Sequence, residues 1–231
     1  MELTDPPETL LRWTSAPRLI PSRYPTVGLL DRVAAPEDLD ALFELEGWTN
    51  DRISGELGLI RAIPQHEWVT GQPMASVVMA AFCHPPPGGS RFSSEDRGAW
   101  YAARTISTAI AESVFRRTEE LREIGAFETR VEMRVYLADF RARFHDVRGH
   151  RRAWNDLYDP DDYAAGQALA RRLLDDGSNG VAYRSVRDPD GECLACFRPA
   201  LVRNVRVGGH YEFRWEGSPE PRVRPLKVAG P

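Results

Sequence analysis

The chain has 231 residues and a mass of 26.0 kDa, enough for one sizeable domain and barely enough for two. Hydrophobic residues make up 42% and charged residues 28%, close to ordinary globular usage, which argues against a disordered or fibrous chain. Thirty basic against thirty-four acidic side chains give a formal charge of −4, whereas a general nucleic-acid binder normally carries a basic surplus. We therefore expect no direct nucleic-acid partner.

The sequence contains no apolar run of the roughly 20 residues that a membrane-spanning helix needs. The opening segment, MELTDPPETLLRW, lacks a basic stretch followed by an apolar one, so it does not resemble a secretion signal. Cys83, Cys193 and Cys196 are the three cysteines, an odd and sparse set that suits a reducing compartment. These observations predict a cytoplasmic protein that does not enter a membrane.

The first half of the chain carries few strong signals of regular structure. Residues 1–17 are punctuated by prolines and are expected to form a loose lead-in. A helix is predicted over 36–46, because Pro36 and acidic residues suit its start and Gly47 suits its end. Residues 75–83, ASVVMAAFC, form a continuous apolar run of strand length, for which we predict a buried strand.

The second half shows clearer periodicity. Helical spacing of apolar residues predicts a main helix over 102–120 and a second helix over 161–176, closed by Gly177. Strict alternation predicts a strand over 130–137, with Tyr136 on the polar face. Four further short strands, separated by turn residues, are predicted at 181–186, 193–198, 201–207 and 211–215.

These elements do not alternate as βαβ units, so the fold class predicted is α+β, with a single mixed or antiparallel β-core and flanking helices. No change in composition divides the chain after residue 17. The expected organisation is a single domain over 18–231, with a possible helical insert at about 36–85.

No metal site is predicted. The five histidines are scattered, and Cys193-x-x-Cys196 has the spacing of half a zinc site without a second pair. Two small core residues within a strand are the simpler interpretation. No serine-hydrolase elbow is present, and Gly88-Gly89 and Gly208-Gly209 fit turns better than phosphate-binding loops.

A more informative segment runs from Gly88 to Glu112. It places Arg91 after a glycine turn, Tyr101 where the predicted helix begins, and Glu112 in mid-helix. Eleven residues make three helical turns, so Tyr101 and Glu112 could share a face. The alternative is that Glu112 is a solvated helix acid paired with Arg116 at i+4.

Several short motifs, taken together and in order, resemble the RES-domain family, which is named for its Arg, Glu and Ser positions. The resemblance extends from about Arg18 to about Val207. The motifs that carry it are Arg18-Leu-Ile-Pro-Ser-Arg-Tyr-Pro-Thr, Ser90-Arg-Phe-Ser, Tyr101-Ala-Ala, Ala109-Ile-Ala-Glu112, Asn179-Gly-Val-Ala-Tyr-Arg-Ser185-Val-Arg and Cys196-Phe-Arg-Pro.

The resemblance implies an ADP-ribosyltransferase-like fold and a bacterial NAD-consuming toxin of a toxin–antitoxin pair. It implies catalytic roles for Glu112, Arg91 and Tyr101, and NAD contacts from Arg18, Arg91, Tyr101 and Ser185. Two departures matter. Leu19 stands where some members have a tyrosine, and some toxins of the family lack the insert between the first two arginines.

Chemistry alone leaves some of these assignments open. A carboxylate such as Glu112 can stabilise an oxocarbenium-like ribose as neutral nicotinamide departs, while arginines can fork onto phosphates. Arg23 competes with Arg18 as the first arginine, and Ser185 could instead satisfy backbone groups at a strand end. The acceptor could be water, phosphate or a protein.

The expected function is therefore that of an NAD glycohydrolase or phosphorylase, a hydrolase or glycosyltransferase that takes NAD as substrate and needs no other cofactor. One alternative is a protein ADP-ribosyltransferase acting on a nucleotide-metabolism enzyme. Another is a non-catalytic nucleotide-binding module on the same fold. The resemblance also implies an Xre-type antitoxin from a neighbouring gene, and a homodimer is possible.

Overall fold

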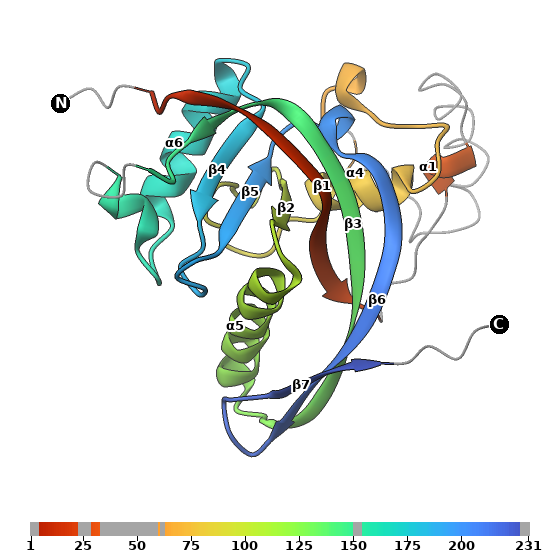
Figure 1. Cartoon of the computed structure of the whole chain (residues 1–231), viewed down its shortest axis with the longest axis vertical. Coiled ribbons are helices and arrows are strands. Elements are labelled where there is room, and N and C mark those ends of the chain that lie inside the picture. Colours follow the sequence, from red (N-terminus) through yellow and green to blue (C-terminus); the bar gives the residue numbers. More distant parts are fainter. Residues whose placement is uncertain (1–4, 23–28, 33–59, 61–62, 150–153, 227–231) are drawn as a thin grey trace.

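Figure 1 shows the computed structural model, which describes residues 5–22, 29–32, 60, 63–149 and 154–226. Within this part of the chain, one seven-stranded sheet has the order β2-β5-β4-β3-β6-β7, and β1 also pairs with β3. The strands are β1 (Glu8–Pro21), β2 (Trp100–Ala103), β3 (Glu128–Asp146), β4 (Gly180–Arg184), β5 (Glu192–Cys196), β6 (Arg203–Glu216) and β7 (Arg222–Leu226). The helices are α1 (Leu29–Arg32), α4 (Ala75–Cys83), α5 (Ile106–Ile124) and α6 (Ala164–Asp175), with single 3-10 turns at Gln65–Glu67, Asn155–Tyr158 and Pro199–Leu201.

Strand β3 joins the two halves of the sheet. It pairs antiparallel with both β1 and β6, and its last residues, His145 and Asp146, pair in parallel with Val181 and Ala182 of β4. The other pairings among the described strands are antiparallel. The strands β1, β3 and β6 form a curved arch, and α5 lies beneath it (Figure 1). A mixed sheet with helices packed against it confirms the predicted α+β class.

The short half of the sheet, β2-β5-β4, is buried on both faces. On one face, Trp100, Ala182 and Leu194 join a core with α4. On the other face, residues such as Val181 and Ala195 join a core with α6. Because successive residues of a strand point to opposite faces and both faces are covered, most positions on these strands are buried, and only Arg184 and Glu192 at one end are charged. The sequence therefore shows short apolar runs there instead of alternation.

Helix α5 has well-defined ends. The Thr105 hydroxyl accepts a hydrogen bond from the Thr108 N–H at the N-terminus, and Gly125 with φ 66° closes the C-terminus. Its Ile110 and Val114 pack on the core between the helix, β3 and β6. The predicted helix therefore exists, but it begins after residue 102, because residues 100–103 form strand β2.

The run at 75–83 is a helix, so the predicted strand is wrong. Helix α4 begins after Met74, and the Asp31 carboxylate accepts hydrogen bonds from the Met74 and Ser76 N–H groups. Six of its nine residues are buried. An apolar run without periodicity fits a helix buried on most sides as well as a buried strand, so pattern alone could not decide between them.

Two further expectations differ from the structure. Residues 8–17, expected to belong to a loose lead-in, form most of β1 and pair with the second half of β3. Tyr136, expected on the polar face of its strand, is fully buried, because that face of β3 packs, with Ala138 and Phe140, into the core that includes α4. The predicted helix at 36–46 lies outside the described residues.

The remaining predicted elements are confirmed with shifted bounds. Helix α6 buries Leu169 and Leu173 as expected, and Gly177 follows it with φ 82°. The two last predicted strands are one continuous strand, β6, in which Gly208 and Gly209 stand opposite the single residue Val135. This glycine pair is therefore a bulge within a strand and not a turn between two strands. No helix in the described part of the chain is both long and apolar enough to cross a membrane.

Gly166 of α6 provides a test of the packing on this side of the sheet. A Cβ at this position would lie 2.1 Å from the Arg91 carbonyl oxygen. Alanine ordinarily stabilises a helix relative to glycine by about 1 kcal/mol. We expect Gly166→Ala to lower the free energy of unfolding by roughly 1–3 kcal/mol instead, because backbone must move.

Urea unfolding measures this difference. Gly209→Ala is the matched control, because a Cβ there meets nothing within 4 Å, and its effect should stay within about 0.5 kcal/mol. A stabilised Gly166→Ala protein would show that α6 and residue 91 are not in close contact.

Candidate active site

Glu112 and Ser185 form the centre of the candidate site. Glu112 lies in the second turn of α5, and Ser185 is the first residue after β4, in the loop that leads to β5. The Ser185 hydroxyl donates to Glu112 Oε1 at 2.5 Å. Ser185 is buried and Glu112 half-buried, so the bond is shielded from water on the serine side. The structure thus joins two predicted residues that are far apart in the sequence.

The alternative for Glu112, a surface pair with Arg116, is not what the structure shows. The guanidinium of Arg116 lies 3.5 Å from Glu120, one turn further along α5. Glu112 instead faces the β4–β5 loop and β5, where the Cys193 thiol lies 4.0 Å from Oε1. Both contacts are made to the same oxygen of the carboxylate, Oε1.

Tyr101 belongs to β2 and not to the helix, so the argument that placed it three helical turns from Glu112 is wrong. Its hydroxyl oxygen accepts the Phe92 N–H at 2.9 Å and lies 3.1 Å from the Ser93 hydroxyl. Burial raises the pKa of Tyr101 to about 12, so the phenol is neutral at physiological pH. Tyr101 therefore fixes the loop that carries Arg91.

Tyr183 is a site residue that the sequence argument missed. Burial raises its pKa well above the ordinary value, and the neighbouring Cys193 and Glu112 raise it further. Its ring packs edge-on against Phe92 with centroids 4.9 Å apart. Tyr183 stands two residues before Ser185, so the period of a strand, which places alternate residues on one side, could have identified it.

Arg91 is buried, and its contacts are with the protein itself. Nη1 donates to the carbonyl oxygens of Leu157 at 2.7 Å and Asp159 at 2.6 Å. The guanidinium also stacks on the ring of Tyr163, 4.8 Å from the centroid. Arg91 thus holds the segment before α6 against the sheet. Binding a phosphate through Nη1 would require it to exchange these two carbonyl groups.

Arg18 lies on β1, and its side chain contacts the backbone of the site residue Tyr101. Its Nη1 donates to the Tyr101 carbonyl oxygen at 3.3 Å, and its guanidinium lies 5.0 Å from the Trp100 ring centroid. Burial lowers the pKa of Arg18 to about 10, which leaves it charged at neutral pH. The competing candidate, Arg23, lies outside the described residues.

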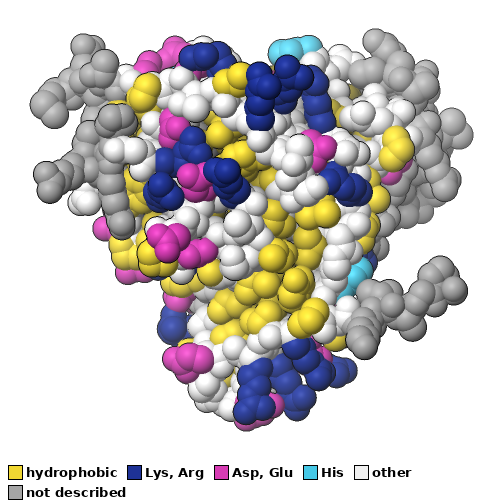
Figure 2. Space-filling view, viewed as in Figure 1, with side chains coloured by type: hydrophobic (Ala, Val, Ile, Leu, Met, Phe, Trp, Pro, Cys, Tyr) yellow, Lys and Arg dark blue, Asp and Glu magenta, His cyan; other side chains and the backbone are white. Residues whose placement is uncertain are grey.

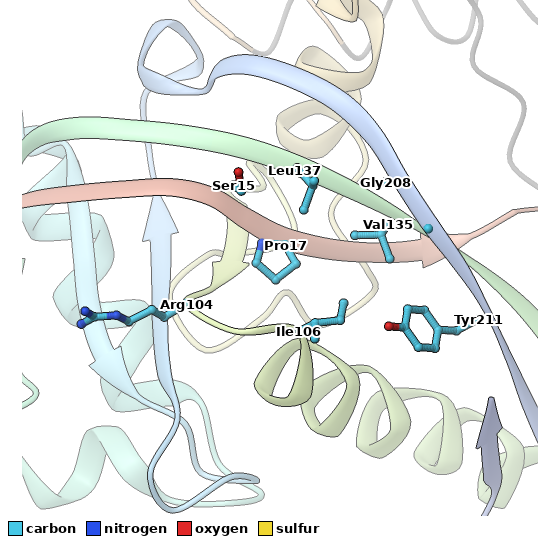
Figure 3. Close-up of a pocket in the computed structure, with 9 residues that line it drawn as sticks. Ser15, Pro17, Arg104, Ile106, Val135, Leu137, Gly208 and Tyr211 are labelled. Carbon is cyan, nitrogen blue, oxygen red and sulfur yellow. The ribbon is translucent and has the colours of Figure 1, made fainter. Parts of the chain in front are cut away.

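A separate pocket opens on the other face of α5. It has a volume of about 290 Å³ and lies between the arch of the sheet and the first turn of the helix (Figure 3). Figure 2 shows an apolar strip on this face of the molecule, with basic side chains on both sides. The pocket is lined by Ser15, Pro17, Arg104, Ile106, Val135, Leu137, Gly208, Gly209 and Tyr211. The predicted site residues are not among those described around it.

Cys193 and Cys196 do not form half of a metal site. They are three residues apart on β5, so their side chains enter different cores on opposite faces of the sheet. Among the described residues, no group of three His, Cys, Asp or Glu side chains is arranged to hold a metal ion.

The chain belongs to the RES domain family, whose model matches residues 59–216. Arg91, Tyr101, Glu112 and Ser185 lie within the matched range, and Arg18 precedes it. An uncharacterised protein of Sinorhizobium fredii (strain NBRC 101917 / NGR234), y4oC, is 28% identical over 201 residues, which cover 87% of this chain and 83% of that protein. A chain of the Mycobacterium tuberculosis MbcT–MbcA toxin–antitoxin complex aligns with a TM-score of 0.41 and 14% identity, over 55% of this chain and 72% of its own length.

The cysteines give a prediction that depends on pH. Burial raises the pKa of Cys83 and of Cys196 to about 12, and that of Cys193 well above its ordinary value. Because the thiolate is the reactive form and stays below about 1% of each thiol up to pH 9.5, alkylation of the folded protein should be very slow at pH 8 and still slow at pH 9.5. Free cysteine, the control, becomes largely ionised over that range.

Mass spectrometry after iodoacetamide treatment counts the modified thiols. We expect none in the folded protein and three after denaturation. Rapid modification of Cys193 in the folded protein would mean that the site around Glu112 is open to solvent from the side of β5.

Proposed function

We propose that this protein is an NAD-degrading enzyme that cleaves the bond between nicotinamide and ribose, as an NAD glycohydrolase or phosphorylase. The observation that carries this proposal is the Glu112 carboxylate, fixed by the Ser185 hydroxyl beside the buried ring of Tyr183. A fixed carboxylate next to aromatic surface suits a cationic, planar substrate.

The chemistry requires little from the protein besides charge and position. The C1′–N bond breaks, its electron pair passes to the pyridinium nitrogen, and nicotinamide departs neutral. The ribose C1′ that remains is oxocarbenium-like, and the carboxylate of Glu112 stabilises its positive charge. A water or phosphate oxygen then bonds to C1′, and where the acceptor is water its proton passes to the solvent.

Within the described part of the chain, the hydrogen bonds of the Glu112 carboxylate are all made by Oε1. Oε2 is therefore the oxygen that can face the substrate. Tyr101 and Tyr183 add no negative charge near it, since burial raises the pKa of both phenols. Arg18 retains its charge and supplies a cation for the phosphates of NAD.

Free nicotinamide is the product that separates the rival functions. Purified protein is incubated with NAD, with and without inorganic phosphate, and with NAD labelled in its adenylate part. Release that needs no phosphate supports a glycohydrolase, and release that depends on phosphate supports a phosphorylase. Label that becomes attached to protein supports an ADP-ribosyltransferase, and NAD binding without release supports a non-catalytic module.

Glu112→Gln tests the proposed catalytic carboxylate. The amide keeps the shape of the side chain and its bond from Ser185 but removes the charge, so NAD cleavage should fall on the order of 10²–10³-fold. Glu119→Gln is the matched control, because Glu119 lies on the same helix and pairs with Arg122 at the surface. Equal activity of the Glu112→Gln and wild-type proteins would make Glu112 an ordinary helix acid.

A toxin role follows from the same chemistry and from the family. Loss of NAD would stop growth, so a cell that makes this enzyme needs an inhibitor of it. We propose an Xre-type antitoxin from a neighbouring gene, whose C-terminal segment blocks the NAD site. A carboxylate on that segment would pair with the charged Arg18.

Coexpression tests this inhibitor. The small protein from the adjacent gene should restore growth at full length and fail without its last few residues. Binding to the Glu112→Gln protein, measured by co-purification, controls for loss of folding in the truncated inhibitor. Full neutralisation by the truncated form would place inhibition elsewhere on the protein.

A further inference from the structure

We propose that Thr108 and Asp188 are positioning residues that set the orientation of the Glu112 carboxylate through Ser185. This inference rests on the proposed function for its kinetic consequences. Its structural basis is the loop over 185–191, called here the β4–β5 loop, which lies along one face of α5.

The Ser185 hydroxyl has no hydrogen-bonding capacity left over. A hydroxyl has one hydrogen to donate and two lone pairs that accept. The Ser185 oxygen accepts the N–H of Arg187 at 3.0 Å and the N–H of Asp188 at 2.9 Å. Its one hydrogen is therefore directed to Glu112 Oε1, at 2.5 Å. In this arrangement Ser185 orients the carboxylate and has no hydrogen to offer to nicotinamide or ribose.

The turn whose N–H groups donate to the Ser185 oxygen is itself bound to helix α5 by Thr108. The Thr108 hydroxyl donates to Asp188 Oδ2 at 2.7 Å, and Thr108 is 1% exposed. Thr108 and Glu112 are four residues apart, so both lie on the face of α5 that the β4–β5 loop covers. The loop thus contacts the helix one turn before the carboxylate and again at the carboxylate.

Two further contacts show how closely the loop packs. A Cβ on Gly191 would lie 2.5 Å from Thr108 Cγ2 and 2.9 Å from Asp188 Oδ2, so any other residue there would displace one of these side chains. The guanidinium of Arg187 stacks on the ring of Phe115, one turn after Glu112. Residues 108, 112 and 115 of α5 therefore all contact the loop, and the position of Ser185 depends on these three contacts.

Removing the Thr108 hydroxyl should release the turn without emptying the core. Thr108→Val keeps the shape of the side chain but cannot donate to Asp188, whereas Thr108→Ser can. We expect Thr108→Val to lower kcat for nicotinamide release about tenfold or more, with the KM for NAD changed less than about twofold. Thr108→Ser should restore kcat to within about threefold of the wild-type value.

Thr118→Val is the matched control. Thr118 is a buried threonine on the same helix, but its hydroxyl contacts Trp215 and Pro219, away from the β4–β5 loop. It should lose stability without a change in kcat. Equal losses of kcat in Thr108→Val and Thr118→Val would reduce the role of Thr108 to folding and overturn the proposal.

A second comparison isolates the route through Ser185. Ser185→Ala has already lost the donor to Glu112, so adding Thr108→Val to it should change kcat less than about twofold. Full additivity of the two losses would show that Thr108 does not act through Ser185, and would overturn the proposal.

Amide hydrogen exchange separates failure of this inference from failure of the proposed function. If the wild-type protein releases no nicotinamide, the proposed enzymatic function is wrong, but the attachment of the β4–β5 loop to α5 by Thr108 can still be measured. The Arg187 and Asp188 amides should be protected in the wild type, should exchange at least about tenfold faster in Thr108→Val, and should be unchanged in Thr118→Val. Free exchange of the Arg187 and Asp188 amides in the wild type would show that Thr108 does not hold the loop, and would overturn the proposal.

Discussion

The pairing of β3 with three other strands is the constraint on which the rest of this structure depends. One edge of β3 pairs with β1, the other pairs with β6, and its last two residues pair with β4. A strand of this length cannot stay flat, because each strand carries a right-handed twist, so the sheet curves into an arch. Helix α5 fills the space beneath it, and the core of Met133, Phe213 and Trp215 packs against its inner side.

This arrangement leaves the two faces of α5 in different surroundings. One face contacts the arch through Ile110 and Val114, and the other contacts the β4–β5 loop through Glu112. The carboxylate therefore lies between the two halves of the sheet. It contacts the short half directly, and the helix that carries it packs on the long half. A charged group in such a position is held by the whole fold and not by a single loop.

The sequence predicted an element of structure correctly where a local pattern of residues specified it, and failed where the structure depends on distant contacts. The α6 helix was predictable from the stripe of Leu169 and Leu173 and from Gly177, and β3 from its alternation. The apolar run at 75–83 has no hydrophobic periodicity, so its helical structure could not be predicted. Strand Trp100–Ala103 is too short to be distinguished by pattern from the helix that follows it. The bond between Glu112 and Ser185 joins positions 73 residues apart. No local pattern predicts it, so only the resemblance to the RES family brought these residues together.

The pairing of β1 with β3 has a consequence for how the chain folds as it is made. Residue 8 pairs with residue 145, so β1 leaves the ribosome long before its partner strand has been synthesised. Contacts of such large sequence separation are slow to form, because the intervening chain must be ordered first. Until then β1 is an unpaired apolar strand, with Leu11 and Trp13 exposed to any other chain in the same state. Aggregation during synthesis is therefore the hazard that this topology creates, and it lasts until β1 pairs with β3.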